Sequence, residues 1–125
     1  MSTIVLPGLS HQILGSCFAV HNALGSGLLE SAYVGALCAE LRHRGIPFAG
    51  QSRFPLVDKG ELIGDYIADL VAADGAIVGI KSVPALTSLM AAQLLNYLHL
   101  AGLPLGYLVN FHGQRLIWKR FASAG

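Results

Sequence analysis

Two charged side chains in an otherwise apolar stretch are the best candidates for chemistry in this chain. They are Asp69 and Lys81, which fall in residues 65–83, DYIADLVAADGAIVGIKSV. This stretch predicts two β-strands joined by a tight turn, and successive strand residues alternate between faces. An acid, a second acid on the next strand and a lysine two residues later form the pattern of a metal-dependent nuclease site, in which two carboxylates hold Mg²⁺. The position for the second acid is Gly79, so the pattern is present with one ligand missing.

The length of the turn decides whether these groups meet. A three-residue loop over residues 73–75, with Gly75 in the left-handed conformation, sets Ala72 opposite Ala76 and Asp69 opposite position 79. A two-residue Asp-Gly turn would shift the register by one and send the two charges to opposite faces. We predict the three-residue loop, and therefore one shared face.

Composition bounds the possible functions. A chain of 125 residues predicts a single domain, here residues 1–125. It is 54% hydrophobic and 12% charged, against roughly 25% charged in an ordinary soluble domain. A surface this poor in charge predicts a homo-oligomer, including higher-order assembly. The net charge is +1 without a basic run, so nucleic acid remains a possible partner that charge does not support.

Hydropathy and cysteine usage predict a cytoplasmic location. No apolar run approaches the roughly 18 residues that cross a bilayer, and the start MSTIVLPGLS is a poor signal peptide. No membrane partner is therefore expected. Cys17 and Cys38 lie in apolar helical contexts, which favours two buried thiols over a disulfide.

The remaining pattern predicts an α/β domain with a mixed sheet of four to six strands and helices on both faces. Three helices are expected, over residues 11–24 behind the cap Ser10, over residues 28–44, and over residues 88–101 between Thr87 or Ser88 and Gly102. Strands are expected over residues 47–57, in the hairpin 65–83, which should hold the centre of the sheet, and in a closing hairpin over residues 106–111 and 114–121. The expected buried stripes are Leu14, Cys17, Phe18, His21 and Leu24 in the first helix and Leu29, Tyr33, Leu37 and Leu41 in the second. His21 is expected to be a hydrogen-bonded core histidine rather than a ligand.

A family resemblance begins at Gly27-Leu-Leu-Glu30-Ser-Ala-Tyr33 and extends over residues 11–121. Five blocks occur in order: HNALGSGLLESAY, ELRHRGI, YIADL, VGIK and QLLNY. Together they resemble the GxxExxY protein family of the PD-(D/E)xK nuclease-like superfamily. The resemblance implies a restriction-endonuclease-like core, a mixed β-sheet flanked by helices.

The resemblance also implies a set of site residues. These are Asp69, Lys81, Glu30, Gln93 and Tyr97, with Asp69 and Glu30 as the metal ligands, weak if they bind at all, and Mg²⁺ as the cofactor if the site is active. Glu30, Gln93 and Tyr97 also have a structural alternative. Glu30 lies in the first turn of its helix, where a carboxylate satisfies the helix dipole, and Gln93 and Tyr97 share one helix face as polar tips.

The chain departs from the family pattern at three positions. Members usually carry an acid at Gly79, an arginine at Ile67 and often a histidine near Leu89. These departures predict a vestigial site in a degenerate nuclease-fold domain that is not expected to catalyse a reaction and acts through self-association or binding. One alternative is a Mg²⁺-dependent nuclease whose acid has moved, supplied by Asp65, Glu61 or Glu30. The other is a structural protein that assembles into rings or filaments, since the third helix is apolar nearly all round.

Overall fold

The computed structural model describes residues 7–73 and 75–123. Its helices are α1 (Pro7–Leu24), α2 (Glu30–His43) and α3 (Ser88–Ala101). Its strands are β1 (Phe48–Ala49), β2 (Ser52–Asp58), β3 (Glu61–Ala68), β4 (Val71–Ala72), β5 (Ala76–Lys81), β6 (Leu105–Asn110) and β7 (Ile117–Ala122). Five strands form a sheet in the order β1-β4-β5-β6-β7, and β2 pairs only with β3.

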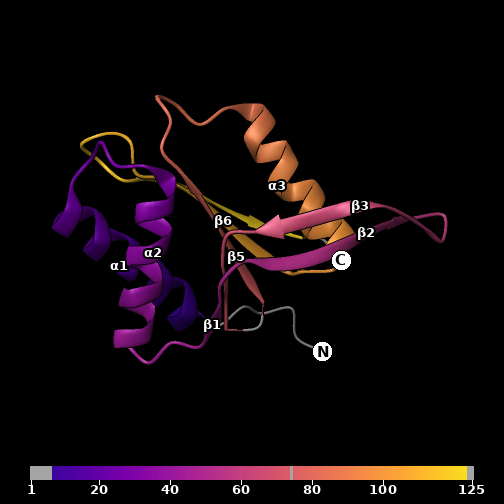
Figure 1. Cartoon of the computed structure of the whole chain (residues 1–125), viewed down its shortest axis with the longest axis horizontal. Helices are drawn as coiled ribbons and strands as arrows, with labels where there is room; N and C mark the ends of the chain where they lie inside the picture. Colours follow the sequence, from indigo (N-terminus) through magenta and orange to yellow (C-terminus); the bar gives the residue numbers. More distant parts are fainter. Residues whose placement is uncertain (1–6, 74, 124–125) are drawn as a thin grey trace.

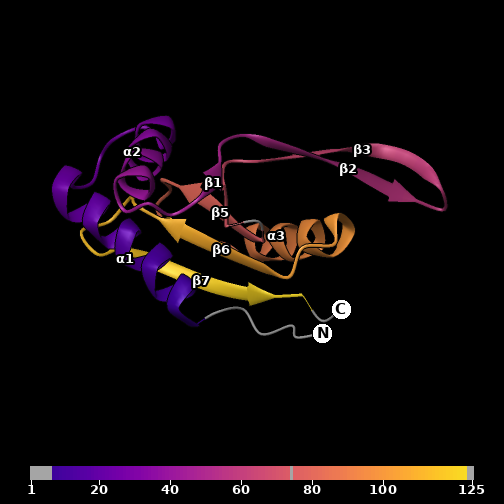
Figure 2. The same ribbon diagram turned by 90° about the horizontal axis from the view of Figure 1, so that it is seen from below.

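Helices cover both faces of the five-stranded sheet (Figures 1 and 2). Along β6, Tyr107 and Val109 pack in the core cluster formed with α1 and α2. Leu108, between them, packs in the second cluster with Leu94 and Leu98 of α3, as the alternation of side chains along a strand requires. β5 and β6 run parallel, with α3 as their crossover, while the other pairs are antiparallel. The predicted α/β class and mixed sheet with flanking helices are confirmed.

The predicted hairpin register is also confirmed. Ala72 is paired with Ala76, and the Val78 N–H donates to the Leu70 carbonyl at 2.9 Å, so the pairing continues toward Asp69. Ala73 adopts the left-handed region with φ 47°, the conformation that the sequence predicts for Gly75. The middle residue of this turn, Asp74, lies outside the described residues.

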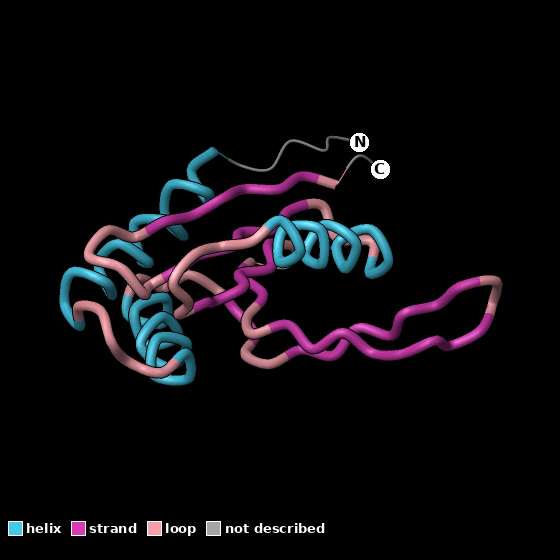
Figure 3. The backbone as a smooth tube through the Cα atoms, turned by 90° about the horizontal axis from the view of Figure 1, so that it is seen from above, coloured by secondary structure: helices cyan, strands magenta, loops and turns pink. Residues whose placement is uncertain are grey.

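The strands before this turn differ from the prediction. Residues 47–57 do not form one strand of the sheet, because only Phe48–Ala49 pair with β4. β2 and β3 instead form a two-stranded ribbon, called the arm below, that projects beyond the body of the molecule (Figure 3). Strand propensity indicates that a segment is extended, but it does not say which strand it pairs with.

The predicted start of α1 and the predicted buried faces of α1 and α2 are partly wrong. α1 begins at Pro7 rather than after Ser10, and proline is a favoured first helical residue. In the expected stripe of α1, Phe18 and Leu24 are each 42% exposed. Leu29, expected in the stripe of α2, is 79% exposed, because it is the N-cap and not a helical residue. The buried face of α1 is instead formed by Ile13, Ser16, Cys17, Val20 and His21.

The third helix and the core histidine agree with the prediction. The Thr87 side chain accepts a hydrogen bond from the Met90 N–H at 3.1 Å, and Gly102 ends α3 with φ 69°. His21 is buried, and its Nε2 lies 2.8 Å from the Gly113 carbonyl. Both cysteines are free, Cys17 buried and Cys38 half-buried. Within residues 7–73 and 75–123, no helix has the length and apolar character to span a bilayer.

Candidate active site

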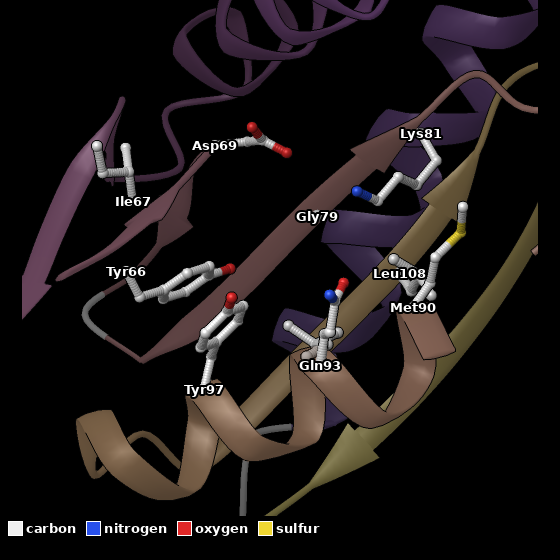
Figure 4. A pocket seen from close by; sticks show the side chains of 10 residues that line it. Tyr66, Ile67, Asp69, Gly79, Lys81, Met90, Gln93, Tyr97 and Leu108 are labelled. Atoms are coloured by element: carbon white, nitrogen blue, oxygen red, sulfur yellow. The ribbon is translucent and has the colours of Figure 1, made fainter. Parts of the chain in front are cut away.

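The predicted site residues meet in a cleft between β5 and α3. Asp69, Gly79 and Lys81 line it from the sheet, and Gln93 and Tyr97 line it from α3, around a cavity of about 120 Å³. Figure 4 shows Asp69 and Lys81 converging on the space beside Gly79, with the Gln93 amide below them. The structure therefore brings together four of the five predicted side chains around the position that lacks one.

Asp69 is held where the chain passes from the arm into the five-stranded sheet. Up to Ala68 the backbone belongs to the arm, so no backbone carbonyl of β3 pairs with the Ile80 N–H of β5. The Asp69 carboxylate takes that place, since its Oδ2 accepts from the Ile80 N–H at 2.9 Å. Hydrogen bonds to a carboxylate are among the stronger ones in proteins. Asp69 thus supports the backbone besides facing the cleft.

Lys81 ends β5, and the chain that follows it is clamped by a buried asparagine. The Asn110 side chain donates to the Val83 carbonyl at 2.9 Å and accepts from the Val83 N–H at 3.1 Å. Its Oδ1 also accepts from the His112 N–H at 3.2 Å. This clamp fixes the backbone two residues beyond Lys81, which orients the lysine toward the cleft.

Aromatic rings form one wall of the cleft. Tyr66 of β3 stacks on Tyr97 of α3, with ring centroids 4.1 Å apart and an interplanar angle of 13°. The ring of Phe54, its cross-strand neighbour, has its centroid 6.3 Å from that of Tyr66. Burial raises the pKa of Tyr66 to about 12, and the nearby Asp69 and Tyr97 add to this rise. Sequence reasoning did not single out Tyr66, since its alternation with Ala68 marks it only as a side chain on the buried face of the arm.

The Gly27, Glu30 and Tyr33 motif forms a clasp beside the site. Gly27 has φ 93°, a conformation that favours glycine. The Ser82 N–H donates to Glu30 Oε2 at 3.2 Å, and the Ser82 hydroxyl donates to the Leu28 carbonyl at 3.1 Å. The buried Tyr33 hydroxyl donates to the Gly25 carbonyl at 2.6 Å. The motif therefore ties the start of α2 to the residue after Lys81.

Glu30 lies on the other side of Asp69 from the cleft. Glu30 and Asp69 both line a second, open cavity of about 550 Å³, together with Gln51 and residues of α2. The other two acids considered as replacements are not near the cleft. Asp65 pairs with Arg53 at 2.9 Å on the arm, and Glu61 lies at the outer end of β3.

The site can accommodate a side chain at position 79. A Cβ added to Gly79 would lie 3.5 Å from Leu108 Cδ1 and 3.6 Å from the Tyr107 carbonyl oxygen, which are ordinary van der Waals distances. The glycine is therefore not required by packing, and the backbone at position 79 permits a larger side chain.

The donor set does not fit a resident Mg²⁺ ion, which is usually held by one or two carboxylates with substrate phosphate. One oxygen of Asp69 is already hydrogen-bonded to the backbone, and Gly79 offers no side-chain ligand. Among the residues that the structure describes, no group of three or more His, Cys, Asp or Glu side chains gathers to hold a metal. The cleft retains the framework of a metal site without enough oxygen ligands.

The comparison with protein families agrees with this geometry. The model of the PD-(D/E)XK nuclease superfamily matches residues 7–121. The chain belongs to this superfamily. No curated protein and no solved structure matches the chain. In the acid, acid and lysine pattern for which the superfamily is named, Asp69 and Lys81 stand at the first and last positions and Gly79 at the middle one.

Proposed function

We propose that this PD-(D/E)XK domain is catalytically degenerate and acts through self-association or binding. The observation that carries the proposal is Gly79, which lies beside Asp69 in the cleft where a second carboxylate would complete the ligand set. A single carboxylate with Lys81 beside it attracts a divalent cation weakly, because the ammonium offsets the charge of Asp69. Without the cation, Lys81 remains to offset the charge on a phosphate, but the residues that line the cleft do not supply the metal-activated water that hydrolysis requires.

Calorimetric titration with Mg²⁺ and Mn²⁺ tests the loss of the metal site. We expect no binding tighter than about the millimolar range that isolated oxygen ligands provide. A nuclease assay on linear, circular and single-stranded substrates, run on the same sample with both ions, should show no turnover above that of Asp69→Ala. Micromolar metal binding that disappears in Asp69→Ala would contradict the proposal.

A second candidate function is a Mg²⁺-dependent nuclease in which the missing acid is replaced by Glu30. The cavity that Glu30 and Asp69 share supports it. The hydrogen bond from the Ser82 N–H to Glu30 argues against it, because a carboxylate used to hold the backbone has less freedom to reach a metal. Nuclease activity abolished by Glu30→Gln, and by Asp69→Asn, would favour this candidate over the first.

Self-association is supported by large apolar side chains on the surface. Those exposed by at least 40% are Phe18, Leu24, Leu28, Leu29, Val57, Leu62, Ile63, Ile67, Leu89, Leu95, Ile117 and Trp118. They lie on α1, before α2, on the arm, on α3 and on β7, and interaction sites are found where such side chains adjoin one another. Light scattering coupled to size exclusion should show a dimer or larger at micromolar concentration, and a monomer at all concentrations would exclude self-association.

A further inference from the structure

The outward face of the arm changes from charged to apolar toward its tip, since Arg53 and Asp65 form an ion pair on its inner part and aliphatic side chains lie farther out. In β2, the side chains of Phe54 and Leu56 face α3, and Leu56 is 8% exposed. Val57 lies on the opposite face, 49% exposed, and its cross-strand partner Leu62 is 66% exposed. Cross-strand partners share a face of a sheet. The arm therefore has one face buried on the body and one face open.

A β-bulge enlarges this open face at the outer end of the arm. Leu56 pairs with Gly64 and Val57 with Leu62, so Ile63 is the extra residue on β3. Ile63 is 60% exposed. A bulge displaces the alternation of side chains and re-aims one of them. Two adjacent aliphatic residues are thus exposed near the tip, where an isolated hairpin is only marginally stable in water.

Acidic side chains flank this apolar tip. Asp58 and Glu61 are exposed cross-strand partners next to the turn. Neither takes part in an ion pair within residues 7–73 and 75–123, where the pairs formed are Arg44–Glu40 and Arg53–Asp65. The tip therefore combines exposed aliphatic surface with two acids and one base, Lys59 of the turn, which leaves it with a net negative charge.

The matching surface is the edge strand β7. It is the outermost strand of the five-stranded sheet, and it contains no proline, so its outer row of N–H and C=O groups can pair with another strand. Ile117 is 49% and Trp118 is 40% exposed, and Lys119 and Arg120 are exposed beside them. Residues 112–123 carry three basic residues and no acid. β7 thus offers apolar surface with the charge opposite to that of the tip.

We infer that the tip of the arm docks on β7 of a second copy of this chain. This inference rests on the proposed self-association and names the surfaces that produce it. Leu62 and Ile63 cover Ile117 and Trp118 of the other copy, and the acids of the tip lie against the bases of β7. β3 is the strand that pairs, because Pro55 removes a backbone N–H from β2. The contact is an addition of a strand to a sheet edge.

The size of the contact explains why a second copy is a suitable occupant. A strand of seven or eight residues is about 25 Å long and a two-stranded ribbon is about 10 Å wide, so one docked arm covers only about 250 Å². A stable interface covers about 800 Å² on each partner. In a reciprocal dimer, where each copy's arm lies on the β7 of the other, two such contacts cover about 500 Å² on each partner, or about 1,000 Å² in total, which is in the range of a weak, concentration-dependent assembly.

The exposed face of α3 is the competing surface. It presents Leu89, Leu95 and Leu100, but residues 84–111 contain no Asp, Glu, Lys or Arg. Such a surface has no charge to fix an orientation, whereas charged pairs across an interface fix its register. Leu89 and Leu62 are both 66% exposed, so they form a matched pair of positions for separating the two surfaces.

Sedimentation velocity of the full chain, from about 1 to 100 µM, tests the inference. Reversing the tip charges (Asp58→Lys with Glu61→Lys) or those of β7 (Lys119→Glu with Arg120→Glu) should raise the dissociation constant at least tenfold, because like charges then face each other. Combining all four substitutions should restore association to within about threefold of the original.

An apolar substitution provides the second, independent readout. Leu62→Ser should weaken association and Leu89→Ser should not, with circular dichroism confirming that both variants remain folded. If the original chain associates but Leu89→Ser dissociates it and the charge reversals do not, the arm is not the interface, although self-association stands. If the original chain is monomeric throughout the range, the docking inference and the proposed self-association both fail.

Discussion

Replacing Gly79 with glutamate is expected to create the divalent-metal site that the cleft lacks. The substitution adds a carboxylate beside Asp69 and Lys81, in a position where an added Cβ meets only Leu108 and the Tyr107 carbonyl at 3.5 and 3.6 Å. Glycine loses more conformational freedom on folding than other residues do, so replacing it in a strand also stabilises the folded state by up to about 1 kcal/mol. Repulsion from Asp69 and attraction to Lys81 oppose each other. We therefore expect the free energy of unfolding of the metal-free variant to lie within about 1 kcal/mol of that of the original chain.

The effect of metal is expected to be much larger. If the second carboxylate brings the dissociation constant for Mg²⁺ to about 0.1 mM, a concentration of about 10 mM is about 100-fold above it and stabilises the folded state by about 2.7 kcal/mol. For a chain of this length, about 1 kcal/mol corresponds to roughly 3–4 °C. The melting temperature of Gly79→Glu should therefore rise by about 8–11 °C with Mg²⁺, and that of the original chain by no more than about 4–6 °C, the shift that a dissociation constant of about 1 mM would give.

Thermal unfolding followed by Trp118 fluorescence measures this difference, and calorimetric titration gives the affinity. Gly79→Gln is the matched control, because glutamine has nearly the shape of glutamate and no charge. Gly79→Glu combined with Asp69→Ala should lose the effect, since one carboxylate then remains. If Mg²⁺ and Mn²⁺ stabilise Gly79→Glu no more than Gly79→Gln, then the cleft is not a metal site that lacks one ligand, and the assignment of its geometry is wrong.

Three further predictions concern side chains whose surroundings the structure defines. Burial raises the pKa of Cys17 to about 12, so a maleimide or disulfide reagent at pH 8 should label the half-buried Cys38 first and reach Cys17 only at the rate of unfolding; equal rates in the native protein would contradict this burial. The pKa of Tyr66 is raised from 10.0 to about 12, so above pH 10 the unfolded chain binds fewer protons than the folded one. Its contribution to stability should then be complete below pH 10 and disappear as the pH passes about 12, and Tyr66→Phe should flatten this part of the curve of unfolding free energy against pH. Tyr33→Phe removes the donor to the Gly25 carbonyl and should lower the free energy of unfolding by about 1–3 kcal/mol, as denaturant titration would show; a change below about 0.5 kcal/mol would mean that water replaces the hydroxyl.

The sequence predicted the centre of the site because the constraints there are local. A three-residue turn containing glycine determines the pairing of Ala72 with Ala76, and that pairing alone places Asp69 beside Gly79 and on the face that carries Lys81. The capping of α3 by Thr87 and Gly102 was predictable for the same reason. These features depend on residues within a few positions of one another.

The features that could not be predicted depend on partners far away in the chain. Residues 61–68 have strand character in either arrangement, and only the whole fold determines that they pair with β2 and leave the sheet. The role of Asn110 is of the same kind, since its side chain binds Val83, far away along the chain. The start of α1 carries two competing local signals, because proline is a favoured first helical residue and serine a favoured N-cap. The prediction followed Ser10, and the helix begins at Pro7.

The hydrogen bond from the Ile80 N–H to Asp69 has a consequence for the history of this domain. A chain that no longer cleaves anything still needs an acceptor at the point where β3 leaves β5, so selection for folding alone would preserve this aspartate. Every glycine codon is a single base change from a codon for aspartate or glutamate. A lineage of this kind would keep its first metal ligand for a purely architectural reason, and would stand one point mutation at position 79 from regaining the second.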